Sequence, residues 1–255
     1  MSEEAVLVEV ADGVMVITLN RPKAKNAVNK AVAVGVAAAI DELESNDELR
    51  AAVITGAEGT FCSGMDLKAF VTGEMPMVEG RGFAGMCEYV ASKPLIAAVE
   101  GYALAGGFEV AISCDLIVAA ENAMFGIPEV KRGLAAAAGG LIKLPKQIPI
   151  RIAKELALTG DFISAGRAYE LGLINQIAAP GAALETARQM AIKIAANGPL
   201  AVAASKAVVD KAQDWNTDVM YPEQQKYILP VLTSQDAIEG ATAFAEKRAP
   251  NWKGK

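Results

Sequence analysis

Strand-like and helix-like segments alternate along most of this 255-residue chain. Two paired strands are predicted at 6–10 and 14–19, because β-rich runs flank a DG turn at 12–13. Helix-forming composition follows over 30–44, and a short apolar run at 51–55 predicts a buried strand. No G-x-G-x-x-G motif follows the first strand, which argues against a dinucleotide-binding sheet. The alternation predicts an α/β fold built from repeated ββα units.

Composition and periodicity predict the later elements in the same way. A surface loop is predicted over 71–81, a helix over 82–92 and a strand from Pro94. A loop rich in Gly and Ala begins at Lys131 and enters another helix by Leu144. The remaining predictions are helices at 150–158, 164–171 and 181–196, and a strand at 173–177.

The clearest boundary in the chain is Asn197-Gly198-Pro199, where two helix-breaking residues follow a helical pattern. Three helix-like segments come after it, at 201–213, 222–232 and 234–248. We therefore predict a core over 1–197 and a helical C-terminal region over 198–255. The apolar residues of that region are expected to fold back on the core or to join an oligomer interface.

The chain contains no histidine. Ser-His-Asp and Cys-His nucleophilic schemes and His-based metal sites are therefore excluded, and acid–base chemistry must use carboxylates, Lys, Tyr or Cys. The three cysteines, Cys62, Cys87 and Cys114, lack paired spacing, which favours buried thiols over a disulfide framework or a zinc site.

Charge and hydropathy limit the partners. The net charge of −6 disfavours nucleic acid, and no uncharged run reaches the roughly 18 residues of a membrane span. The first residues, MSEEAVLVEV, lack the basic start and apolar centre of a secretory signal. We expect a cytoplasmic protein that binds neither nucleic acid nor membrane.

The segment from Val99 to Glu129 concentrates residues suited to chemistry. Gly106-Gly107 directly precede FEVAIS, a run that can open a buried helix. Free N–H groups at such a helix start stabilise negative charge, including an oxyanion. A plain strand-to-helix turn explains the glycines equally well.

Glu109 and Glu129 are the two acids of this apolar segment that invite a chemical role. A carboxylate in apolar surroundings is costly unless it is paired, protonated or solvated. Glu109 in a first helical turn either performs chemistry or caps its own helix. Glu129 either performs chemistry or forms a surface salt bridge with Lys131 or Arg132.

Two earlier loops carry further candidates with ordinary alternatives. Lys23 and Lys25 lie in a Pro- and Asn-containing loop, where solvated charges are the simple interpretation. Asp66 precedes a predicted helix and suits an N-cap.

Four segments resemble, in order and spacing, the crotonase or enoyl-CoA hydratase/isomerase superfamily over essentially the whole chain: LNRPKAKNAVN, FCSGMDLKAF, AAVEGYALAGGFEVAISCDLIVAAENAMFGIPEVKRG and ALTGDFISAGRAYELGLINQI. The resemblance implies a crotonase-type spiral of ββα units with a helical C-terminal region used to form a homotrimer or a dimer of trimers. It also implies acyl-CoA thioester substrates, a role in fatty acid metabolism, and no metal or redox cofactor, since coenzyme A is part of the substrate.

The resemblance also assigns site residues. The oxyanion hole falls on the backbone N–H groups of Met65 and Gly106, and the catalytic glutamates on Glu109, which activates water, and Glu129, which delivers the α-proton. The residues implied to bind the CoA ester are Lys23, Ala24, Lys25, Ser63, Gly64, Asp66, Leu67, Gly107 and Pro128.

The chain departs from the common family pattern beside the expected acyl end. Ala136-Ala137 and Leu141-Ile142-Lys143 stand where a Pro-Gly pair and Thr-Gln-Arg are usual. GGFE, KLPK, the insert-like FVTGEMPMVEGRGFAG and the tail DAIEGATAFAEKRAPNWKGK look closer to the carnitinyl-CoA dehydratase branch. An enoyl-CoA hydratase is the expected activity. The alternatives are a carnitinyl-CoA dehydratase-like enzyme, an enoyl-CoA isomerase and a noncatalytic acyl-CoA-binding protein.

Overall fold

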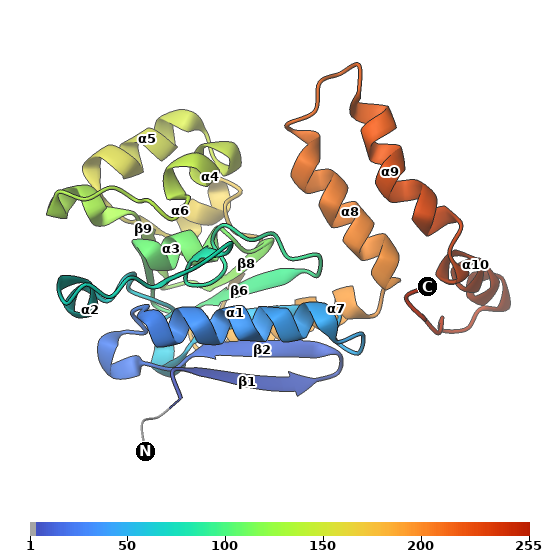
Figure 1. Cartoon of the computed structure of the whole chain (residues 1–255), viewed down its shortest axis with the longest axis horizontal. Coiled ribbons are helices and arrows are strands. Elements are labelled where there is room, and N and C mark those ends of the chain that lie inside the picture. Colours follow the sequence, from blue (N-terminus) through green and yellow to red (C-terminus); the bar gives the residue numbers. More distant parts are fainter. Residues whose placement is uncertain (1–3) are drawn as a thin grey trace.

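The computed structural model describes residues 4–255, so the first three residues of the acidic N-terminal segment lie outside it. A central sheet orders its strands β1-β2-β3-β6-β8-β11 (Figure 1). The β1–β2 pair is antiparallel and the other neighbours are parallel. The strands are β1 Val6–Ala11, β2 Val14–Leu19, β3 Ala51–Gly56, β6 Leu95–Val99, β8 Leu116–Ala120 and β11 Gln176–Ala178.

Short strands of a second sheet, ordered β10-β9-β7, follow the strands of the first. β6 leads to β7 (Tyr102–Leu104) and then to helix α3 (Gly106–Ala111). β8 leads to β9 (Met124–Gly126) and then to the 3₁₀ helix η3 (Pro128–Arg132). This repeat confirms the predicted α/β fold of ββα units, and β10 (Ile163–Ser164) completes the sheet.

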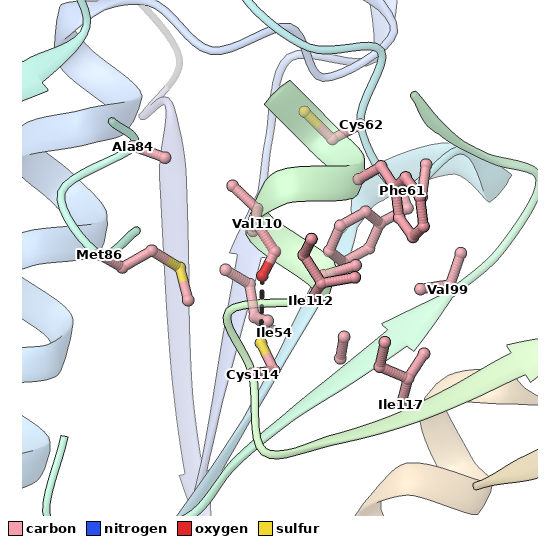
Figure 2. Packing of buried hydrophobic residues seen from close by; sticks show 14 of the residues in the cluster. Ile54, Phe61, Cys62, Ala84, Met86, Val99, Val110, Ile112, Cys114 and Ile117 are labelled. Carbon is pink, nitrogen blue, oxygen red and sulfur yellow. Dashed lines mark hydrogen bonds between the residues drawn. The ribbon is translucent and has the colours of Figure 1, made fainter. Parts of the chain in front are cut away.

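The parallel strands β2, β3, β6 and β8 are buried on both faces, whereas the edge strand β1 is exposed along most of its length. Alternate residues of β2 point to opposite sides: Val14 and Val16 pack in the cluster with helix α7 (Ala183–Ala195), and Met15 and Ile17 pack with α1 (Lys30–Ser45). The cluster on the α1 side also contains the buried side chains of α3. Figure 2 shows part of this cluster between α3 and the strands.

All three cysteines are free and buried, as predicted. Figure 2 shows the Cys114 Sγ directed at the carbonyl oxygen of Val110, 3.5 Å away. Burial raises the pKa of the Cys62 and Cys87 thiols to about 12, so neither is a ready nucleophile.

The remaining helices lie at two ends of the molecule. Figure 1 shows α4, α5 and α6 beside α3, and α8, α9 and α10 standing away from the sheet. The C-terminal helices begin at Pro199, but the division into parts 1–197 and 198–255 stays a prediction. The bounds are α2 Leu67–Val71, α4 Gly140–Gln147, α5 Ile150–Thr159, α6 Ala165–Glu170, α8 Pro199–Ala212, α9 Met220–Leu232 and α10 Gln235–Glu246.

The helix predicted over 82–92 is wrong. The segment begins with β5 (Gly82–Phe83), which pairs with β4 (Met77–Val78) inside the predicted loop, and then continues as turns. Ala84 and Gly85 have positive φ angles of 55° and 70°, which a right-handed helix does not allow. The backbone of Gly85 also lies so close to α1 that a Cβ would stand 2.2 Å from the Ala33 carbonyl oxygen.

The strand predicted at 173–177 begins later, at Gln176, and the buried Leu173 and Ile174 precede it. Within residues 4–255 no single helix meets the length and hydropathy expected of a membrane span, although α7 and α8, bent by 110°, meet them as a pair.

Candidate active site

The loops that follow β2 and β3 meet at one edge of the sheet, because these strands are parallel neighbours. The buried Asn26 side chain joins them, since its Nδ2 donates to the carbonyl oxygens of Ala57 at 2.9 Å and Thr60 at 2.6 Å. The Ser63 N–H donates to the Lys25 carbonyl oxygen at 3.1 Å. The structure thus brings the candidate segments 23–25 and 63–67 together.

Lys23 and Lys25 lie on the loop that follows β2, on either side of Ala24 at the end of the 3₁₀ helix η1 (Pro22–Ala24). Neither lysine is buried, and Leu67, at the start of α2, is exposed. These positions suit both solvated charges and contacts with a phosphorylated ligand.

Asp66 is the N-cap that its sequence position predicts. Its Oδ1 accepts hydrogen bonds from the Lys68 and Ala69 amides, and its Oδ2 pairs with Arg21 at 2.8 Å. Burial opposes ionisation of Asp66, but the Arg21 hydrogen bond and charge and the two amides outweigh it and lower the pKa of this carboxyl. Arg21, which sequence reasoning missed, fastens the first loop to α2.

The Gly64-Met65 turn lies against the start of α3. The Leu104 N–H donates to the Cys62 carbonyl oxygen at 3.0 Å, which aligns the turn with β7. A Cβ on Gly64 would lie 3.2 Å from the Gly106 nitrogen. Within the described residues, the N–H groups of Met65 and Gly106 donate to no protein acceptor.

The residue before Gly106 is strained. Ala105 has φ 52° and ψ −131°, a conformation that L residues rarely adopt and that concentrates at functional sites. Gly107 permits close packing, because a Cβ there would lie 2.2 Å from the Cys62 carbonyl oxygen. A Cβ on Gly106 would stand 2.6 Å from the Phe83 ring, so both glycines are required by the packing.

Glu109 is 3% exposed and does not cap its own helix. Its Oε1 instead accepts hydrogen bonds from the amides of Ala138 and Gly140, each at 2.8 Å, across the loop that departs from the family pattern. Burial raises the pKa of the Glu109 carboxyl, against the opposing effect of the two amides and of Lys143. The capping interpretation is wrong for this residue.

Glu129 lies on η3, directly after the buried Pro128. Its Oε2 is buried without a hydrogen-bond partner in the described chain, and Lys131 pairs with Asp161 instead. The surface salt bridge considered from the sequence is therefore absent from residues 4–255. Burial first, and the charge of Glu109 second, raise the pKa of Glu129 to about 7.

β7 and β9 are paired, so α3 with Glu109 and η3 with Glu129 both follow neighbouring strands, and the charge of Glu109 raises the pKa of Glu129. Glu109 is fixed by two amides, whereas Glu129 has an oxygen free to take a proton or a ligand. Such a pair of unequal carboxyls suits a base and an acid that act on one substrate. Within residues 4–255 no group of three or more metal-ligating side chains is placed to hold a metal ion.

Comparison with known proteins agrees with this geometry. The model of the enoyl-CoA hydratase/isomerase family matches residues 9–255. A carnitinyl-CoA dehydratase of Salmonella typhi is 41% identical over 250 residues, which cover 95% of each chain. A carnitinyl-CoA dehydratase of Proteus mirabilis is 40% identical over the same coverage.

Solved structures are similar over the full length. An enoyl-CoA hydratase from Mycobacterium tuberculosis has 58% identity and a TM-score of 0.97, with coverage of 99% of this chain and 100% of the other. A carnitinyl-CoA hydratase from Mycobacterium avium has 44% identity and a TM-score of 0.80, with full coverage of both chains. The predicted crotonase-type fold and hydratase-type enzyme are confirmed at the level of the family. This chain belongs to the enoyl-CoA hydratase/isomerase family.

Proposed function

We propose that this protein is an enoyl-CoA hydratase, a hydro-lyase that adds water reversibly to the α,β double bond of an acyl-CoA thioester. The unequal environments of Glu109 and Glu129 carry this proposal. One carboxylate is held by two amides, and the other belongs to a partly buried acid whose pKa is raised to about 7. Membership of the family supplies the substrate class.

The N–H groups of Met65 and Gly106 would bind the thioester carbonyl oxygen. As water attacks, this oxygen gains negative charge as an enolate, and donors already in place stabilise it without reorganisation. Removal of one such donor typically costs about 3 kcal/mol of transition-state stabilisation. The strained conformation of Ala105, directly before Gly106, supports this assignment.

The glutamates would divide the proton transfers. Glu109 removes a proton from water as the water oxygen bonds to the β-carbon. Glu129 donates its proton to the α-carbon, so the carbon–carbon double bond becomes single and one water molecule is consumed. The raised pKa of Glu129 keeps its proton available near neutral pH.

The two loops that follow β2 and β3 would bind the CoA moiety. Lys23 and Lys25 carry charges suited to phosphate oxygens, and Ala24, Ser63, Gly64 and Leu67 belong to the same two segments that meet there. Gly107 and Pro128 would support the thioester end by packing, and Asp66 by fixing α2.

A carnitinyl-CoA dehydratase-like activity is the second candidate. Relatives at 40% and 41% identity carry that name, and the departure at 136–143 borders Glu109 through Ala138 and Gly140. The two candidates share the same hydration chemistry and differ in the acyl group.

Hydration assays with crotonyl-CoA, crotonobetainyl-CoA and longer enoyl-CoAs test both candidates. Loss of the enoyl absorbance should occur with at least one substrate, and Glu109→Gln and Glu129→Gln should each lower kcat by roughly 10²- to 10⁴-fold. Unequal losses with double-bond migration would indicate an isomerase. CoA-ester binding without turnover, unchanged in both variants, would indicate a noncatalytic binding protein.

We further propose that the chain forms a homotrimer or a dimer of trimers in the cytoplasm, serves fatty acid metabolism and uses no metal or redox cofactor. Exposed apolar side chains on the C-terminal helices, among them Tyr221, Ile238 and Phe244, support association. Proton transfer between two carboxyl groups and the substrate needs no metal or redox cofactor.

A further inference from the structure

Lys143 belongs to the segment 141–143, where the sequence leaves the family pattern, and it lies on α4, whose first residue, Gly140, donates its amide to Glu109. The Lys143 Nζ donates to the Cys87 carbonyl oxygen at 2.6 Å and to Ser113 Oγ at 2.7 Å. Ser113 Oγ in turn donates to the Glu109 carbonyl oxygen at 2.6 Å. One side chain thus joins α4 to the C-terminal end of α3 and to the turns that follow β5.

In the part of the chain that the structure describes, Lys143 has no ion-pair partner. Within residues 4–255 no carboxylate lies within 4.0 Å of its Nζ. Burial lowers the pKa of the Lys143 ammonium, and the negative charges of Glu109 and Glu88 oppose that effect. The two oxygens at Cys87 and Ser113 both accept hydrogen bonds from Nζ, and this arrangement also favours the charged form.

The charges that act on Glu109 are few. Glu129 on η3 is negative when ionised and disfavours a second negative charge nearby. Lys143 on α4 is the cation that lowers the pKa of Glu109, and Cys87 has its own thiol pKa raised to about 12 and is neutral. Without Lys143, the groups among residues 4–255 that oppose protonation of this buried carboxylate would be the amides of Gly140 and Ala138.

We propose that Lys143 is a positioning residue of the active site: it fixes α3 through Ser113 and supplies the positive charge that keeps Glu109 in its base form beside Glu129. This inference rests on the proposed function, because it concerns the same two glutamates. Lys143 itself contacts neither carboxylate. It acts through the electric field of its ammonium group and through its hydrogen bond to Ser113.

The test measures the pH profile of kcat/KM with the best enoyl-CoA substrate for Lys143→Met, Lys143→Gln and Lys143→Arg. In the Met and Gln variants, loss of the charge should move the acid limb of the pH profile upward by about 0.5 to 1 pH unit. At pH values below the limb, kcat/KM should then be lower than in wild type by roughly 3- to 10-fold. The Arg variant keeps the positive charge, so its acid limb should lie at the wild-type pH. Gln keeps a hydrogen-bond donor, so a shift in Lys143→Gln identifies charge rather than packing, and it also serves if the Met variant does not fold.

Lys146→Met is the matched control. Lys146 lies on the same helix, and its exposed ammonium pairs with Asp214 at 3.0 Å. Removal of this charge should leave the acid limb of the pH profile within about 0.2 pH units of its wild-type position, since solvent screens exposed charges.

A second readout does not depend on turnover. Infrared titration of the carboxyl C=O band that disappears in Glu109→Gln reports protonation of Glu109 directly. If wild-type protein hydrates no enoyl-CoA while the pH midpoint of this band still shifts upward in Lys143→Gln, the proposed function fails and the electrostatic role of Lys143 remains. If wild-type protein is active but both the acid limb and the midpoint of the band are unchanged in Lys143→Gln, the role of Lys143 is refuted.

Discussion

At the scale of single residues, Glu109 and Glu129 differ in what their carboxyl oxygens contact. Glu109 is held by backbone amides that come from about 30 residues further along the chain, so no local pattern shows them. The sequence identifies both acids as unusual but leaves capping and salt-bridge alternatives open. Asp66 shows the opposite case, because its capping partners lie within three residues and are predictable.

Glu129→Gln should stabilise the fold at alkaline pH. A carboxyl whose folded-state pKa is raised from 4.5 to about 7 binds more protons in the native state than in the unfolded state between these values. This contribution to the free energy of unfolding of the wild-type protein therefore falls as pH rises through this window, and the Gln variant lacks it. After allowance for partial solvent access, the variant should gain about 1 to 2 kcal/mol relative to wild type between about pH 5 and about pH 8. Urea unfolding at both pH values measures this gain, and a pH-independent difference would contradict the raised pKa of the partly buried Glu129.

At the scale of elements, the site depends on the contact between the turn at Gly64-Met65 and the start of α3. The sequence predicts that FEVAIS can open a helix, and α3 begins two residues earlier, at Gly106. The segment 82–92 has helical composition yet forms a short strand and turns. Its backbone must pass closely against α1, and such long-range contacts are not encoded in local propensity.

Gly64→Ala should impair activity through this contact. Gly64 has φ 100°, and the new Cβ would lie 2.8 Å from the Ala105 Cβ and 3.2 Å from the Gly106 nitrogen. Displacement of the Gly106 and Met65 amides should lower kcat/KM by about 10²-fold, the loss typical of one oxyanion donor.

Gly59→Ala is the control for backbone strain in the same loop. Gly59 has φ 73°, but no atom lies within 4 Å of the position that a Cβ would take. Its kcat/KM should stay within about twofold of wild type, with a loss of stability of about 1 kcal/mol. Equal losses of activity in the two variants would show that strain in the loop, rather than the amide positions, limits the reaction.

At the scale of the whole molecule, α8, α9 and α10 extend from the sheet and expose large apolar side chains (Figure 1). Phe244 is 88% exposed and Ile238 is 70% exposed, although both lie in a helix with a buried face. An isolated chain rarely leaves such groups in water, so their exposure favours association.

The double substitution Ile238→Ser and Phe244→Ser should weaken this association. Light scattering after size exclusion should give a mass of three or six chains for wild type and a lower mass for the variant at about 1 μM protein. Val34→Ser on α1, which also removes an exposed apolar side chain, should leave the mass unchanged. A monomeric wild-type protein would contradict the predicted oligomer.

The pH dependence of kcat/KM for the wild-type protein tests the central claim most directly. The active form of the glutamate pair carries one proton, which resides mainly on Glu129, so kcat/KM should be bell-shaped with an alkaline limb near an apparent pKa of about 7. Since hydration neither consumes nor releases a proton overall, dehydration of the hydroxyacyl-CoA should show the same limb. A profile that is flat or rising from about pH 7 to about pH 9 in both directions would contradict the assignment of Glu129 as the acid of a two-glutamate hydratase.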